Sequence, residues 1–302
     1  MAVSAPQLVR VDVWTIGGSA VPTVITQGLS FPCPAVAFAS DGTLFVANGG
    51  NDTVTAYAPP YTGAPLVISV GIKGPVSLAV DAGNDLIVAN NSNHNVTIYP
   101  PPYTTAAPTT LSDIGPTQAS AVLDAGNHLW VVASTPYLLR YSAPYTPGAF
   151  DVAIGGVPST LGTPSALAVD AAGRPYVADS NKIVRFDPPF SNAGPALTIS
   201  STASQPITSP SALAVAPDGT IFVANTNTSG PAFYSPTGTP LGVTIGFYNV
   251  NVTLGANAFA ADADGTMWLA RNQPGFPTPY GPANFTSLTP YSAAGDAIAI
   301  YP

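Results

Sequence analysis

Two histidines are the side chains of this sequence best suited to acid–base chemistry near neutral pH. His94 lies in the Asn-rich stretch 90–95, and His128 follows Gly126 and Asn127. A general acid–base pair needs both groups within hydrogen-bond reach of the reacting atoms. The two histidines do not occupy equivalent positions in the sequence repeat described below. We therefore interpret both as surface residues and predict no catalytic residue.

Oxygen-rich stretches are the candidate metal ligands. Asn and Asp gather at 48–52, 90–95, 179–181 and 225–228. Calcium takes about six to eight oxygen ligands, whereas each stretch offers at most one carboxylate, Asp52 or Asp179. Asn in such loops commonly satisfies its own backbone in a turn. We predict turns, no metal ligand and no cofactor, with weak calcium binding as the alternative.

Other motifs for chemistry are missing from the sequence. Cys33 is the only cysteine, so no internal disulfide forms, and no nearby base would activate its thiol. We interpret it as a small buried residue. The sequence contains no Gly-rich phosphate loop, no Cys/His metal spacing and no Gly-x-Ser-x-Gly turn. One further set of aspartates, typical of hairpin turns, is Asp81, Asp124, Asp170 and Asp262.

Composition excludes several classes of partner. The chain of 302 residues has 7% charged residues, seven Lys and Arg, and a net charge of −8. Nucleic-acid binding needs clustered cations that replace phosphate counterions, so we predict none. No apolar run is long enough for a membrane-spanning helix, and the first residues show no signal peptide. Asn-x-Ser/Thr triplets, relevant only in a eukaryotic secretory route, begin at Asn51, Asn90, Asn95, Asn227, Asn251 and Asn284.

A repeat positions these residues. The stretch 34–48 returns five more times, and the equivalent end positions are 48, 90, 134, 179, 225 and 271, a period of 42 to 46 residues. Each copy contains a small apolar strand, an Asp/Gly turn, a strand of larger residues, an alternating strand that ends in Pro-Tyr or Pro-Phe, and an outer strand. This period with four short strands is typical of propeller blades. We expect the repeated aromatic residue to plug the gap below its sheet, with sugar stacking as the alternative.

The ends of the chain are expected to close the ring. Residues 1–34 contain outer strands without inner ones, and the tail 296–302 matches the third strand at 94–100. The sequence therefore predicts one all-β domain, 1–302, a six-bladed β-propeller of four-stranded antiparallel blades closed by N- and C-terminal strands in one blade. The segment 272–295 is then an insertion. A competing register makes 285–291 the last third strand and 297–300 its outer strand.

The pattern Pro-x-Ala-Leu-Ala-Val-Asp-x-x-Gly followed by Val-Ala-Asn or Val-Ala-Asp resembles the NHL-repeat class of β-propellers over about residues 22–302. Similar propellers include gluconolactonase-like metal hydrolases and streptogramin-type lyases. For those enzymes the resemblance implies acidic, Asn or His ligands on a metal at the mouth of the central channel. The class also includes binding scaffolds and cell-surface proteins, so the fold alone does not assign a function.

The sparsely charged surface and the absence of glutamate favour a non-catalytic interaction or structural module rather than an enzyme. We expect it to be exposed outside the cell or held in a virion or tail-like particle, with a protein partner or a surface ligand. The insertion is the candidate contact segment, or a plug over the channel, and its candidate contact residues are Phe276, Tyr280, Phe285 and Tyr291. The alternative is a metal-dependent lyase or lactonase with its site at the channel mouth.

Overall fold

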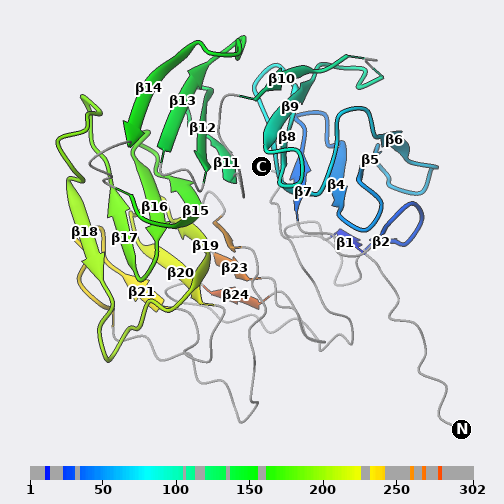
Figure 1. The fold of residues 1–302 in the computed structure, drawn as a ribbon. Helices are drawn as coiled ribbons and strands as arrows, with labels where there is room; N and C mark the ends of the chain where they lie inside the picture. Colours follow the sequence, from blue (N-terminus) through cyan, green and yellow to red (C-terminus); the bar gives the residue numbers. More distant parts are fainter. Residues whose placement is uncertain are drawn as a thin grey trace, which may run out of the picture.

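The structure is a computed structural model that describes residues 11–13, 23–30, 35–104, 107–112, 120–133, 137–155, 161–225, 232–241, 259–261, 267–269 and 278–280. Every helix or strand assigned within these ranges is a β-strand. No helix that could cross a membrane occurs in these ranges. Figure 1 shows the strands gathered into separate sheets that follow one another around a common centre.

The strands follow the predicted repeat. The first sheets contain β1 (Val11–Val13) and β2 (Thr23–Ile25), then β3 (Val36–Phe38), β4 (Leu44–Asn48), β5 (Thr53–Tyr57) and β6 (Leu66–Ile68), then β7 (Pro75–Val80), β8 (Leu86–Asn90), β9 (Asn95–Tyr99) and β10 (Thr109–Leu111). The next contain β11 (Ser120–Leu123), β12 (His128–Ala133), β13 (Tyr137–Ser142) and β14 (Phe150–Gly155), then β15 (Pro164–Val169), β16 (Pro175–Asp179), β17 (Lys182–Arg185) and β18 (Leu197–Ser200). The last contain β19 (Pro210–Val215), β20 (Ile221–Asn225) and β21 (Ala232–Tyr234), then β22 (Phe259–Ala261), β23 (Met267–Leu269) and β24 (Thr278–Tyr280).

Each sheet is an antiparallel meander whose spatial order follows the sequence. Among the described residues, four sheets have four strands, namely β3–β6, β7–β10, β11–β14 and β15–β18. The first strand of each sheet contacts the first strand of the next, through β3, β7, β11, β15, β19 and β22. These first strands therefore surround the axis, and the later strands lie progressively farther out (Figure 1). This arrangement confirms an all-β propeller fold.

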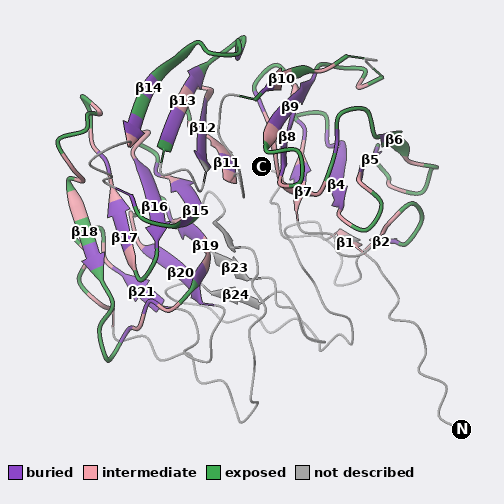
Figure 2. Cartoon of the chain, in the orientation of Figure 1, coloured by how far each residue is buried: buried purple, intermediate pink, exposed green. Residues whose placement is uncertain are grey.

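The core lies between neighbouring sheets. The second strands β4, β8, β16 and β20 are buried at all five positions. One cluster joins Ile87 of β8 to Leu129 of β12, and another joins Tyr176 of β16 to Ile221 of β20. Figure 2 shows this burial on the inner strands, whereas outer strands such as β6 and β14 carry many exposed residues. The larger residues of the second strand thus fill the gaps between sheets, as their pattern predicts.

The repeated aromatic residue folds back under its own sheet. The hydroxyl groups of Tyr61 and Tyr103 each donate to a backbone carbonyl in the turn between the first and second strands, at 2.9 Å from Gly42 O and Asn84 O respectively. Tyr145 repeats this contact in the third sheet and is 1% exposed. These contacts support the plug interpretation rather than a ring of sugar-stacking aromatics.

The N-terminal strands contact the next sheet as an outer strand does. The hydroxyl of Tyr57 donates to Gln27 O, just as the hydroxyl of Tyr99 donates to Val70 O after β6. The amide of Ser30 donates to Asn48 Oδ1, as the amide of Lys73 donates to Asn90 Oδ1. β2 therefore occupies the place of an outer strand before the first complete sheet, with β1 paired beside it.

The C-terminal part shows one pairing within the predicted insertion. β24 lies inside 272–295 and pairs antiparallel with β23, so it is the third strand of the last described sheet. Phe276, Phe285 and Tyr291 lie outside the described residues, and only the backbone of Tyr280 is described. The number of blades and the closure of the ring also depend on residues outside the described ranges.

Candidate functional site

The turns between first and second strands form one end of the innermost layer. Three of these turns begin with an aspartate that accepts amide hydrogen bonds from its own turn: Asp81, Asp124 and Asp170. In each case the same Oδ1 accepts from the amides two and four residues later, at 2.8–3.0 Å. The aspartates are thus the turn residues that their spacing predicts. The fourth aspartate of the set, Asp262, lies outside the described residues.

Neighbouring turns bond directly to one another. Asn84 Oδ1 accepts hydrogen bonds from the amide and the hydroxyl of Ser40, at 2.9 and 2.8 Å. One sheet farther on, Asn127 Oδ1 accepts from the amide of Ala82 at 2.9 Å. The turns 39–43, 81–85, 124–128, 170–174 and 216–220 are hereafter called the rim. The rim surrounds the axis at one end of the first strands.

The fourth residue after each rim aspartate differs in charge. It is Asp85 after Asp81, His128 after Asp124, and Arg174 after Asp170. Burial, together with the nearby charge of Asp81, raises the pKa of Asp85. Arg174 instead forms an ion pair with its aspartate, with Nη2 2.7 Å from Asp170 Oδ2. The same backbone turn thus presents an acid, a histidine and a cation on three successive sheets.

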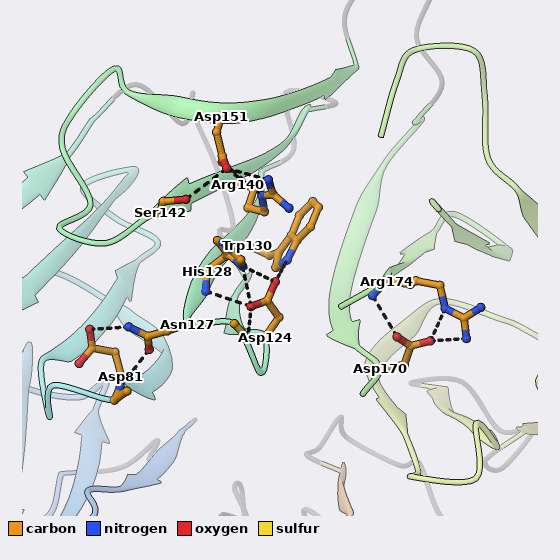
Figure 3. A network of polar contacts seen from close by, with 12 residues as sticks. Asp81, Asp124, Asn127, His128, Trp130, Arg140, Ser142, Asp151, Asp170 and Arg174 are labelled. Atoms are coloured by element: carbon orange, nitrogen blue, oxygen red, sulfur yellow. Dashed lines mark hydrogen bonds and ion pairs between the residues drawn. The ribbon is translucent and has the colours of Figure 1, made fainter. Parts of the chain in front are cut away.

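The pair Asp124 and His128 has the geometry of an acid–base site. His128 Nδ1 lies 2.9 Å from Asp124 Oδ1 and 3.0 Å from Oδ2. The Asp124 side chain is 4% exposed, whereas the His128 side chain is 34% exposed. Trp130 Nε1 donates to Asp124 Oδ2 at 2.9 Å, so the imidazole and the indole are both directed at one carboxylate (Figure 3).

The carboxylate of Asp124 stays ionised despite its burial. Burial alone would raise its pKa, but hydrogen bonds from the His128 amide, the Trp130 indole and the His128 ring outweigh that effect, and the pKa is lowered. A charged carboxylate holds the Nδ1–H tautomer of a neutral imidazole and leaves Nε2 as a base. The partly exposed His128 can therefore exchange a proton with a bound molecule.

The imidazole of His128 rests against the turn itself. An added Cβ on Gly126 would lie 2.7 Å from His128 Cε1 and 2.8 Å from Nδ1. Real Cβ atoms do not approach that closely, so a glycine at this position is required for the ring to occupy its place. Gly126 also donates its amide to Asp124. One short turn thus positions both members of the pair.

The second histidine lies at the other end of the strands. His94 is in the loop between β8 and β9, with a φ of 53°, whereas His128 begins β12 directly after the rim turn. The structure therefore does not bring the two histidines together. The pairing of His128 with Asp124 was missed by sequence interpretation. The sequence shows the spacing of four residues across a Gly-containing turn, but the turns with Asp85 and Arg174 share that spacing.

The acidic and histidine side chains of the described residues are spread over several places in the fold. No group of three or more His, Cys, Asp or Glu side chains comes together within them. The two loop carboxylates have partners from the chain: Asp52 binds Lys73 and the amide of Gly74, and Asp179 accepts from the amide of Thr163. We therefore assign no step to a metal ion.

Comparison with known proteins supports the fold. Residues 73–99 match the model of the NHL repeat. No curated protein sequence matches the chain. The chain therefore resembles NHL-repeat β-propellers in fold. It is similar to selenomethionine-substituted virginiamycin B lyase from Staphylococcus aureus, with a TM-score of 0.63 and 10% identity over 80% of this chain and 79% of the other.

Two further structures are lyases of the same kind. A streptogramin B lyase has a TM-score of 0.64 and 13% identity, and the match covers 81% of this chain and 80% of the other. A catalytically inactive histidine-to-alanine variant of the S. aureus lyase with quinupristin has a TM-score of 0.67 and 10% identity, over 86% and 84% of the two chains.

These comparisons correct the functional prediction. A non-catalytic module was predicted because glutamate is absent and charge is sparse, but the structures that resemble this chain are enzymes. The absence of glutamate is weak evidence against an active site, since a carboxylate–histidine pair needs only Asp and His and can form within one turn. The absence of a cofactor, the protein partners and the extracellular or virion location stay predictions.

Proposed function

We propose that this chain is a lyase whose active site lies on the rim, with His128 as the general base. The observation that carries the proposal is the contact of the partly exposed His128 ring with the buried carboxylate of Asp124. The likeness in fold to streptogramin B lyases adds support, and so does the histidine whose replacement accompanies inactivity in one of them.

The reaction follows from the pair. His128 Nε2 takes a proton from a carbon next to the bond that breaks, and the electron pair of that C–H bond forms a new double bond. The bonding pair leaves with the oxygen of a carbon–oxygen bond, such as that of a ring ester. Asp124 stabilises the imidazolium that forms, and a positioned base of this type contributes about 10²–10⁴-fold to a rate.

The neighbouring turns supply groups that can orient a substrate. Asp85 and Arg174 occupy the same turn position as His128 on the two adjacent sheets. Because burial and Asp81 raise the pKa of Asp85, this carboxyl group can hold a proton more readily than an ordinary aspartate. Arg174 can donate to carbonyl or carboxylate oxygens. We therefore place the substrate across the rim turns that contain these three residues.

A finer architecture is part of the proposal. We propose six blades in a closed ring, in which β1 and β2 supply the outer strands of the closing blade and the C-terminal part of the chain supplies its inner strands. The contact of Tyr57 with Gln27, which repeats that of Tyr99 with Val70, supports this place for β2. Closure would remove open sheet edges next to the first complete sheet.

The test uses the purified full chain with quinupristin and, separately, a simple sugar lactone. Mass spectrometry follows the loss of each compound. Ring opening by elimination leaves the mass unchanged, whereas hydrolysis adds one water, so the product distinguishes a lyase from a lactonase. We expect turnover without a mass increase and a loss of roughly 100-fold or more in His128→Ala.

His94→Ala is the matched control because it removes the other histidine from the opposite end of the strands. We expect it to retain wild-type activity. Turnover that survives in His128→Ala but not in His94→Ala would overturn the assignment. Failure of the unmodified chain to convert either compound would count against the lyase proposal itself.

A further inference from the structure

Asp81 and Asp124 occupy equivalent positions on the rim, but their Oδ2 atoms have different hydrogen-bond partners. Asp81 Oδ2 contacts the next sheet, where the Tyr145 hydroxyl donates at 3.1 Å and Asn127 Nδ2 lies at 3.5 Å. The residues equivalent to this tyrosine and asparagine in the sheet after Asp124 are Phe190 and Gly173. Phenylalanine has no hydroxyl and glycine has no side chain, so these residues cannot bind Asp124 in the same way.

The backbone of Gly173 nevertheless approaches Asp124 closely. A Cβ added there would lie 3.7 Å from Asp124 Oδ2. The next sheet therefore lies beside the carboxylate, and none of its described residues donates a side-chain hydrogen bond to it. Trp130 supplies the donor instead, from the same sheet as Asp124. Oδ2 of Asp81 thus accepts a hydrogen bond from the next sheet, whereas Oδ2 of Asp124 accepts one from the indole of Trp130.

The indole is held firmly in place. Trp130 is fully buried, and the ring of Phe190 packs edge-on against it at a centroid distance of 5.0 Å. The guanidinium of Arg140 lies 5.4 Å from the Trp130 ring centroid, a distance typical of a cation–π contact. Arg140 is itself bound by Asp151, at 2.7 Å between Nη2 and Oδ2. Figure 3 shows Arg140 between Asp151 and the indole of Trp130, and Asp124 between that indole and His128.

We propose that Trp130 is a positioning residue for His128 and acts through Asp124. This inference rests on the proposed function, because it assigns a role to the partner of the proposed base. Apart from Trp130, Asp124 Oδ2 has only the shared contact with the His128 ring itself, whereas Oδ1 accepts two backbone amides as well. Without the indole, the carboxylate could turn so that the imidazole meets it at a different angle. By donating to Oδ2, Trp130 fixes the plane of the carboxylate, so that the imidazole meets it with Nδ1–H and keeps Nε2 for substrate.

The test compares Trp130→Phe with Phe190→Leu. The first variant removes the indole donor, whereas the second disturbs the packing of the same ring and retains the donor. The readout is the ¹⁵N shifts of the His128 ring in the free protein, which report the tautomer. We expect Trp130→Phe to reduce the Nδ1–H tautomer and to raise the pKa of Asp124, followed by its carboxyl ¹³C shift, while Phe190→Leu changes neither.

A second variant covers the case in which Trp130→Phe fails to fold. Asp124→Asn keeps the volume and removes the charge, and we expect it to change the His128 tautomer in the same direction. In turnover assays, Trp130→Phe should lower kcat by roughly ten-fold with little change in KM. An unchanged tautomer in Trp130→Phe, or the same change in Phe190→Leu, would overturn the positioning role.

The two proposals fail separately. The ring shifts need no substrate, so they test the positioning of His128 even if the protein converts neither quinupristin nor the lactone. A second outcome is turnover that depends on His128 while the tautomer of its ring is the same in Trp130→Phe as in the wild type. In that case the lyase proposal stands and the positioning role of Trp130 is wrong.

Discussion

Tyr145 donates its hydroxyl to Asp81, a residue 64 positions earlier on the preceding sheet, at 3.1 Å. The hydroxyl also lies 3.2 Å from Asn127 O in its own sheet. This buried contact joins the plug of one sheet to the rim turn of its neighbour. The hydroxyls of Tyr61 and Tyr103 donate instead to backbone carbonyls in the turns of their own sheets. The third plug therefore contributes to the association of two sheets, in addition to closing the gap below its own.

Replacement of Tyr145 by phenylalanine should lower the free energy of unfolding. The change removes a hydrogen bond to a charged, buried acceptor, which typically costs about 1.5–3 kcal/mol. Tyr61→Phe is the matched control, because it removes a partly exposed bond to a neutral carbonyl, at about 0.5–1.5 kcal/mol. Urea unfolding of both variants measures the difference. Equal losses in the two would show that the contact with Asp81 adds nothing.

High pH should destabilise the fold through its buried tyrosines. Burial raises the pKa of Tyr234 to about 12, and burial together with the charge of Asp81 raises that of Tyr145 well above its ordinary value. The unfolded chain releases these protons near pH 10, whereas the folded protein retains them. Above that pH the unfolded state binds fewer protons, so the free energy of unfolding falls as pH rises from about 10.

Urea unfolding at several pH values between 8 and about 11 measures this slope. Tyr234→Phe should show a smaller fall, because it removes one of the groups that titrate. Its hydrogen bond to Gln205 O is also lost, so the comparison uses the slope with pH and not the stability at one pH. A slope equal to that of the wild type would exclude a contribution from Tyr234.

Much of the fold is predictable because the same pattern of apolar and turn residues recurs in each repeat. Apolar residues such as Phe45 and Ile87 recur at the buried second strand, and Asp–Gly pairs mark the turn before it. One ambiguous copy can be interpreted from the others. The C-terminal copy departs most from the pattern, and there the segment predicted as an insertion contains the paired strand β24.

The candidate site was not predictable in the same way. The turns that contain His128, Asp85 and Arg174 all begin with an aspartate four residues earlier. Spacing alone therefore gives no reason to choose His128 as a site residue. The role of Trp130 depends on its side chain reaching back to the turn at Asp124, which the alternation of the strand does not show. A repeat predicts what its copies share, whereas the site lies in what one copy does differently.

A buried charge in the fourth complete sheet provides a further test. Asn90 donates its amide group to Asn95 Oδ1 and Thr97 Oγ1, at 3.1 and 2.9 Å. The equivalent residue of the next sheet but one is Asp179, which is fully buried and has Lys182 Nζ 3.2 Å from Oδ2. Lys182 occupies the strand position of Asn95. An ion pair thus replaces an amide contact at the same place.

Lys182→Ala should destabilise the protein by roughly 2–3 kcal/mol, because it leaves the buried carboxylate without its counter-charge. This figure is below that of a fully buried pair, since the lysine is 35% exposed. The double variant Asp179→Asn with Lys182→Asn copies the second sheet and should recover stability to within about 1 kcal/mol of the wild type. Thermal and urea unfolding check both. A double variant as unstable as Lys182→Ala would contradict the inference that the ion pair and the amide contact are interchangeable at this place.

Gly126→Ala should separate stability from activity. The added methyl group would lie 2.7 Å from His128 Cε1 and 3.1 Å from Asp124 Oδ1, so the imidazole must move away from the carboxylate. Because a partly exposed ring can move at little cost, we expect a loss of stability below about 1 kcal/mol. The displaced base should lower turnover by roughly ten-fold or more. Gly83→Ala is the matched control, since it alters the equivalent place in a turn that has Asp85 instead of a histidine. Turnover that falls equally in both variants would mean that the rim turns, and not the position of His128, determine activity.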